Sequence, residues 1–149
     1  MADAIIEVVG IDELPMFVEL YNQIFRPAKD IESFRRRYLG RYNILQMIAR
    51  VDDKPVGFFL GFELKPTTFF AWFYGVSADY RRQGIASQLM EAAHAWAKAH
   101  EYEVMRLECH NQHRPLLHLA IVLKYNIVGI RWDADRTDNL VLFEKYLDD

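Results

Sequence analysis

The segment from residue 67 to 77 constrains the fold of this chain most strongly. Five aromatic residues crowd into it, and they fall on both faces of an extended chain, namely Phe69, Phe70, Trp72, Phe73 and Tyr74. A strand that is apolar on both faces must be covered on both sides. The segment therefore predicts a central strand of a sheet that has helices on each face.

Two apolar runs precede this strand and indicate an antiparallel meander. Residues 43–51 and 55–64 are joined by Asp52-Asp53-Lys54, a short polar loop typical of a hairpin. Periodicity and turn residues predict the other elements. These are a strand at 4–9, a helix opening at Asp12 and closed by Pro27, a helix at 30–38, a long helix from Gly84, a strand at 103–110, a helix from Arg114, and strands at 125–132 and 139–146.

The order of these elements predicts an α/β (α+β) fold. Three consecutive strands form a meander, and a strand–helix–strand crossover then extends it. We expect a mixed, mostly antiparallel central sheet of about seven strands, flanked by about four helices. The length of 149 residues suits one domain, so residues 1–149 are expected to form a single unit.

Composition excludes several classes of protein. Hydrophobic residues make up 52% of the chain and charged residues 26%, which is typical of a globular protein and not of a disordered one. The net charge of −3 argues against a nucleic-acid-binding protein. The only cysteine, Cys109, rules out an internal disulfide, and no apolar stretch approaches the length of a membrane span. We expect a cytoplasmic protein that binds no membrane.

The loop from Val76 to Ala86 is the strongest candidate for a binding site. It links a buried strand to a long helix, and Gly84 and Ala86 keep the backbone uncovered there. The first N–H groups of a helix have no partner within it, and the helix dipole favours an anion such as a pyrophosphate. Arg81 and Arg82 add positive charge. The loop is neither a P-loop nor a dinucleotide-binding fingerprint, because it lacks their glycines and lysine.

In its motif and its position the loop resembles that of the GNAT superfamily of N-acetyltransferases. In that family an arginine–x–x–glycine–x–glycine/alanine loop wraps the pyrophosphate of coenzyme A, and Arg81, Gly84 and Ala86 match it. The resemblance extends over essentially the whole chain in element order. It implies a GNAT-like fold, acetyl-CoA as co-substrate, and no metal.

The resemblance also implies roles for individual residues. The N–H groups that would face the pyrophosphate belong to Arg82, Gln83, Gly84, Ile85, Ala86 and Ser87. The backbone N–H near Val76 would donate to the thioester carbonyl as an oxyanion donor. Asn111 fits the family's asparagine after the fifth strand.

The general acid is ambiguous. The family places a tyrosine seven residues after the asparagine, where this chain has His118, whereas counting back from Lys124-Tyr125 gives Ala120. Imidazole can donate a proton near neutral pH, so His118 is a candidate catalytic residue, although it could equally be a partly buried helix residue.

Candidate bases for the amine come from the strands. They are Glu63, Glu108 and His110, with Tyr74 as a polar group on the central strand. Alternation places Arg106, Glu108 and His110 on one face, so an ion pair of Glu108 with Arg106 is the favoured alternative to catalysis. Water could also relay the proton. Cys109 is not expected to be a nucleophile.

The sequence thus predicts an N-acetyltransferase in which the primary amine of a small molecule or peptide attacks the acetyl group directly in a ternary complex. A coenzyme A-binding module without turnover is the alternative, and a nucleic-acid-binding domain using Arg35 to Arg37, Arg81 and Arg82 is a weaker one. A homodimer through the last strands is possible. The acceptor stays open, and the aromatic candidates for its pocket, most of them expected to be core, are Tyr21, Phe25, Tyr38, Tyr42 and Trp132.

Overall fold

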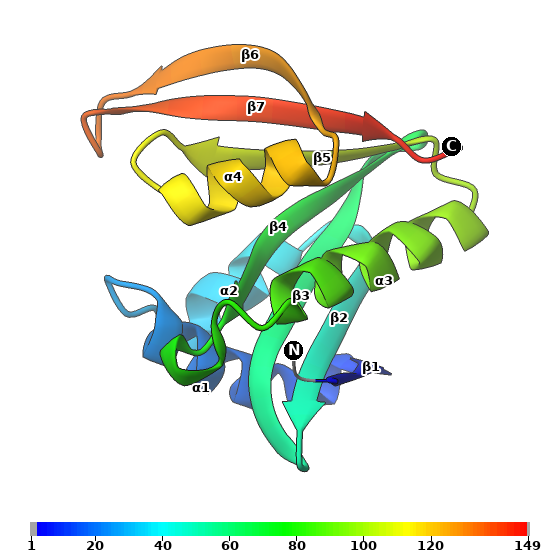
Figure 1. The fold of residues 1–149 in the computed structure, drawn as a ribbon, viewed down its shortest axis with the longest axis vertical. Helices are drawn as coiled ribbons and strands as arrows, with labels where there is room; N and C mark the ends of the chain where they lie inside the picture. Colours follow the sequence, from blue (N-terminus) through cyan, green and yellow to red (C-terminus); the bar gives the residue numbers. More distant parts are fainter. Residues whose placement is uncertain (1–2, 149) are drawn as a thin grey trace.

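The computed structural model describes residues 3–148 and contains the predicted elements in the predicted order (Figure 1). The helices and strands are β1 (Ile5–Val9), α1 (Leu14–Ile24), α2 (Ile31–Tyr38), β2 (Tyr42–Val51), β3 (Lys54–Lys65), β4 (Thr68–Val76), α3 (Ile85–Ala99), β5 (Val104–His110), α4 (Arg114–Val122), β6 (Asn126–Asp133) and β7 (Asp138–Tyr146). Short 3-10 turns lie at Ile11–Glu13 and Ala78–Tyr80. The strand that was predicted at 67–77 is thus observed with one residue fewer at each end.

The strands form one seven-stranded sheet in the order β1-β2-β3-β4-β5-β7-β6. Only β4 and β5 run parallel, and all other neighbours are antiparallel. Their pairing extends from Thr68↔Val104 to Ala71↔Leu107 and then ends. Beyond Ala71 the two strands diverge, as Figure 1 shows. This confirms the predicted mixed, mostly antiparallel sheet.

Each face of the sheet is covered by two helices. On one face, α1 and α2 pack over β2 and β3, and the fully buried rings of Phe17, Phe34 and Phe58 meet there. On the other face, α3 and α4 cover a second core that contains Phe59 and Leu89. Each fully buried side chain of this size contributes about 2–3 kcal/mol. The aromatic strand β4 supplies side chains to both cores, as its sequence predicted.

The order of the last strands positions the turn between β6 and β7. Because β7 lies between β5 and β6, this turn comes back over the carboxyl end of β5. The N–H of Asn111 donates to the carbonyl of Asn139 at 2.8 Å and fixes that end of β5 to β7. Within residues 3–148 no helix has both the length and the apolar character that a membrane span needs.

Candidate functional site

A groove of about 780 Å³ lies between the end of β4, the start of α3 and the helix α4. Most of its wall is apolar, and its charged rim has three arginines, Arg81, Arg82 and Arg114. Its lining contains the predicted loop residues Val76, Arg81, Arg82, Gly84, Ile85, Ala86 and Ser87. The structure therefore brings the contiguous loop and the distant helix α4 together as two sides of one groove.

The loop of the groove presents a row of bare backbone N–H groups. From Arg82 through Ser87 no N–H has a hydrogen-bond acceptor in the described part of the chain, and the first bond of α3 runs from the N–H of Gln88 to the carbonyl of Gly84 at 3.1 Å. Arg82 and Gly84 have φ angles of +63° and +80°. Alternation of left-handed and right-handed residues turns successive N–H groups into one concavity, which binds anions.

Val76 has its own backbone N–H directed away from β3. The N–H of Ser77 donates to the carbonyl of Val56 at 2.7 Å, and antiparallel strands alternate between bonded and non-bonded pairs. The paired residue Val76 therefore faces the opposite side, where β5 has already diverged. The carbonyl of Val76 accepts a bond from Nε of Arg81 at 3.1 Å, so this arginine lies in the same gap.

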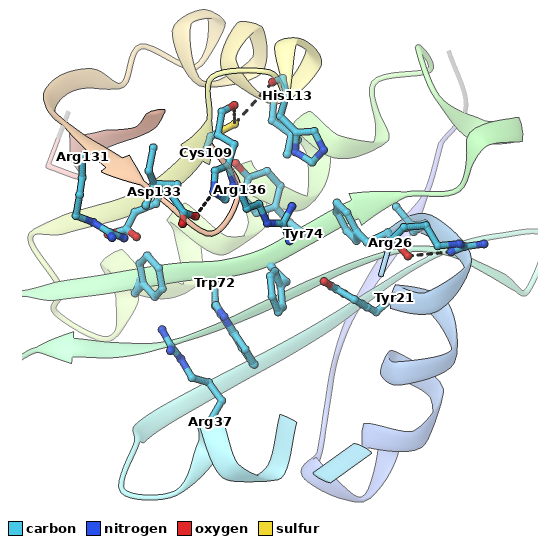
Figure 2. Close-up of a pocket in the computed structure, with 18 residues that line it drawn as sticks. Tyr21, Arg26, Arg37, Trp72, Tyr74, Cys109, His113, Arg131, Asp133 and Arg136 are labelled. Atoms are coloured by element: carbon cyan, nitrogen blue, oxygen red, sulfur yellow. Dashed lines mark hydrogen bonds and ion pairs between the residues drawn. The ribbon is translucent and has the colours of Figure 1, made fainter. Parts of the chain in front are cut away.

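A second cavity, of about 550 Å³, opens beside the groove (Figure 2). It is lined by α1 and the turn after it, by β4, by the end of β5 and by the β6–β7 hairpin. The groove and this cavity share two lining residues, Tyr74 and Leu116. They therefore meet at the gap where β4 and β5 separate. A molecule in either cavity would reach one in the other there.

Tyr74 lies on the wall that both cavities share, and most of its side chain is buried. Its side chain is buried, and burial raises the pKa of its phenol well above the ordinary value, so the hydroxyl stays protonated. That hydroxyl has no hydrogen-bond partner among the described residues, yet no fully enclosed side-chain oxygen or nitrogen there lacks one. The hydroxyl of Tyr74 is therefore accessible from the cavities.

His110 enters the second cavity from the end of β5 and is held by Asp133. Its Nε2 lies 2.8 Å from Oδ2 of Asp133, and this hydrogen bond lowers the pKa of the carboxyl. Because an ionised carboxylate only accepts, Nε2 is the donor of this hydrogen bond. Nδ1 has no hydrogen-bond partner in residues 3–148.

Two other predicted bases are engaged elsewhere. Glu108 lines the same cavity, but its Oε2 accepts from Nε of Arg106 at 3.2 Å, which is the ion pair that strand alternation predicted. Glu63 accepts from the hydroxyl of Tyr102 at 2.9 Å and lines neither cavity. His110 is therefore the predicted base whose geometry suits proton transfer.

Cys109 also borders the second cavity, and its chemistry is that of an inert thiol. Burial, and to a smaller extent the charge of Asp138, raises the pKa of this thiol to about 12. Its sulfur donates to the carbonyls of His110 and His113. Since the nucleophilic form of cysteine is the thiolate, Cys109 is unsuited to covalent catalysis.

The other predicted residues fall at several places. His118 is exposed on α4 and lines the groove beside Leu119. Gln83 and Asn111 line neither of the two cavities. Among the aromatic candidates, Tyr21 and Phe25 line the second cavity, whereas Tyr38, Tyr42 and Trp132 do not.

Several lining residues were not anticipated from the sequence as parts of a site. They are isolated in the chain and come together only through the topology, namely Arg26, Trp72, Arg114, Arg131 and Arg136. Arg114 was read only as the start of a helix. A lone arginine in a polar turn is usually solvated, so its type and spacing give no signal of this placement.

A bare-amide anion site at a helix start, beside a gap between parallel strands and next to a second cavity, defines a class of protein. It is that of acyltransferases that take their acyl group from coenzyme A. The chain belongs to the acetyltransferase (GNAT) family, whose family model matches residues 14–121. It is accordingly an acyltransferase enzyme, and acetyl-CoA is its co-substrate. The volume of the groove, its bare N–H groups and its arginines fit that molecule.

Solved structures support the same assignment of fold. The ribosomal-protein-S18-alanine N-acetyltransferase of Escherichia coli superposes with a TM-score of 0.84 at 16% identity, over 97% of this chain and 94% of that one. For the IAA acetyltransferase of Bacillus cereus the values are 0.81, 17%, 97% and 99%. For yncA of Salmonella typhimurium, solved with its cofactor acetyl-CoA, they are 0.77, 14%, 99% and 96%. Among proteins with curated descriptions none matches this sequence significantly.

Proposed function

We propose that residues 1–149 form one domain that transfers the acetyl group of acetyl-CoA to the primary amine of a small molecule by direct attack in a ternary complex. The observation that carries this proposal is the shared wall. The groove and the second cavity meet at Tyr74 and Leu116, so donor and acceptor can be bound at once on the two sides of the gap. Such juxtaposition removes the entropic cost of a bimolecular encounter.

The groove holds the donor through its backbone. The N–H groups from Arg82 through Ser87 bind the pyrophosphate, and Arg81, Arg82 and Arg114 neutralise charge at the rim. When bound, acetyl-CoA supplies an activated acetyl thioester. The N–H of Val76 lies in the gap and donates to the carbonyl oxygen, on which negative charge develops.

The cavity side manages the protons. His110, held in one tautomer by Asp133, accepts the proton of the amine at Nδ1. The hydroxyl of Tyr74 is the first candidate to protonate the departing thiolate, because it lies on the common wall. His118 is the second candidate for that donation, since it lines the groove.

A thiol-release assay tests the proposal. Purified protein with acetyl-CoA and a panel of primary amines should release free thiol in proportion to the acetylated amine, and calorimetry should show binding of acetyl-CoA without an amine. Binding without thiol release from any amine would contradict the proposed transfer. Absence of any heat with acetyl-CoA would contradict the role of the groove.

We also propose a cytoplasmic location and a homodimer, both of which the sequence analysis suggested. A cytoplasmic location is tested by fractionating cells that produce the protein. A homodimer through the last strands is tested by light scattering, and β6 is an edge strand with exposed Ile127, Ile130 and Trp132. A single monomeric mass at all concentrations would contradict the dimer.

A further inference from the structure

The second cavity has a surplus of positive charge that the protein itself does not neutralise. Four arginines line it, namely Arg26, Arg37, Arg131 and Arg136, against two carboxylates, those of Glu108 and Asp133. The chain as a whole carries a net charge of −3. A cationic cavity in an acidic protein is therefore a local feature and not a consequence of composition.

Both carboxylates of the cavity are already engaged. Glu108 is paired with Arg106, which also bonds Glu144 at 3.1 Å, and Asp133 is paired with His110 at 2.8 Å. By contrast, within residues 3–148 none of the four lining arginines lies within 4.0 Å of a carboxylate oxygen. Nη1 of Arg26 donates to the backbone carbonyls of Asn22 and Phe25. The donors available for an anion therefore belong chiefly to Arg37, Arg131 and Arg136.

The four arginines of the lining come from separate segments. Arg26 follows α1, Arg37 is in α2, Arg131 is in β6 and Arg136 lies in the turn before β7, and Figure 2 shows them at separate places around the cavity. Of the run Arg35 to Arg37, only Arg37 lines the cavity, while Arg35 pairs with Glu32 at 2.6 Å. Four arginines from separate segments around one cavity differ from a run of arginines on a solvated helix face.

Two of these guanidinium groups are held toward the cavity. Arg37 lies over the ring of Trp72 at 5.4 Å, and desolvation with the nearby charge of Arg41 lowers its pKa, while the charge of Glu108 opposes this shift. The charge of Arg136 lowers the pKa of His113 after β5, where burial has the largest effect, and it opposes the burial that raises the pKa of Tyr21 in α1. The charge of Arg136 therefore affects groups on both the α1 side and the β5 side of the second cavity.

We infer that the acceptor is a small primary amine that also carries a carboxylate, such as an amino acid, with the carboxylate bound by these arginines. The inference rests on the proposed acetyl transfer. Arginine matches a carboxylate through two parallel N–H donors. The rings of Tyr21, Phe25, Trp72 and Phe73 line the cavity between the arginines and accept an apolar or aromatic body. A volume of about 550 Å³ suits a small molecule.

The test compares each amino acid with its amide, for example phenylalanine with phenylalaninamide. The amide is the chemically more reactive amine at neutral pH, because its amino group has the lower pKa, so a preference for the acid must come from the protein. We expect kcat/KM for the preferred acid to exceed that for its amide by about tenfold or more, as for hydrogen bonds between charged groups. Equal values, or a preference for the amides, would overturn the inference.

Variants of the arginines sharpen the test. R131Q and R136Q should each lower kcat/KM for the acid by about tenfold and leave that for the amide unchanged. R136K should recover part of the loss, and R35Q, which alters an exposed arginine outside the cavity, is the matched control. An equal loss with both acceptors would be a structural effect and would overturn the inference.

The two levels fail differently. Thiol release with amino-acid amides but not with the corresponding amino acids would refute the carboxylate site and leave the proposed acetyl transfer unaffected. Acetylation of acidic peptides with none of free amino acids would refute the small-molecule class. Thiol release from no amine, despite bound acetyl-CoA in calorimetry, would refute the proposed function itself.

Discussion

The two halves of the proposed site offer different chemical groups to a ligand. The groove uses backbone N–H groups and an apolar wall, and its conformation is set by φ angles at Arg82 and Gly84. The second cavity offers side chains, mainly guanidinium groups, histidines and aromatic rings, from six segments of the described chain. The groove should therefore tolerate changes of side chain better than changes of backbone conformation. The second cavity should be sensitive to the replacement of single side chains.

The largest expected effect tests the backbone half. In Gly84→Val, a β-branched residue cannot hold a φ of +80°, so the loop shifts and its N–H groups no longer converge. Loss of two charge-assisted hydrogen bonds, at about 1.5–3 kcal/mol each, corresponds to roughly a thousandfold loss of affinity for acetyl-CoA in calorimetry.

Gly40→Val is the matched control for this change. Gly40 has a φ of +72° after α2, and a Cβ there would meet no atom within 4 Å. The backbone strain is similar, yet the groove is not involved. If both variants lost affinity alike, the loss would reflect general destabilisation, and the contrast between the halves would fail.

The next effect concerns the cavity half. His110→Ala removes the proposed base, and kcat should fall by about a hundredfold while the affinity for acetyl-CoA stays the same. His118→Ala places the same chemical change in the groove. Unchanged turnover in His118→Ala would remove that histidine from the mechanism, and unchanged turnover in His110→Ala would remove the base proposed here.

A smaller effect is expected at the common wall. Tyr74→Phe removes only a hydroxyl that has no hydrogen-bond partner among residues 3–148, so stability should not change. If that hydroxyl protonates the thiolate, kcat should fall by about tenfold. Tyr80→Phe, in the groove but outside the cavity, is the control. Equal turnover of Tyr74→Phe and the parent protein would shift the role of acid to another group.

The smallest effect is expected for a side chain whose removal should hardly change the affinity for acetyl-CoA. Ser87→Ala alters a side chain at the start of α3 while keeping its backbone N–H in place. Affinity for acetyl-CoA should change by less than about twofold, since the recognition proposed here is by the backbone. A loss of tenfold or more in calorimetry would show that the hydroxyl itself binds, and would blur the distinction between the halves.

The same distinction explains what could be predicted from the sequence. The groove loop is one continuous stretch from Val76 to Ser87, and its glycine, its arginines and the strand and helix around it are visible in order. The fold was predictable for a similar reason, because the apolar periodicity of β4 and of α3 is local. The ion pair of Glu108 with Arg106 followed from strand alternation.

The acceptor cavity could not be predicted in this way. Arg26, Arg131 and Arg136 are single arginines in turns or on an edge strand, and Arg131 and Arg136 reach the cavity only because β7 is inserted between β5 and β6. Trp132 was a candidate for this pocket, yet it is the neighbouring Arg131 and Asp133 that line it, since successive residues of a strand point to opposite faces. A shift of one residue changes the face completely.

The wall common to both cavities makes the two substrates partners in one equilibrium. If a ligand in the groove improves binding in the second cavity by some free energy, a ligand in the second cavity improves binding in the groove by the same free energy. Replacements at Leu116 should thus change the dissociation constants of both ligands, whereas replacements deep in the groove or in the second cavity should change only one. Selectivity for the amine would then be adjustable from the donor side, without altering any atom that contacts the amine.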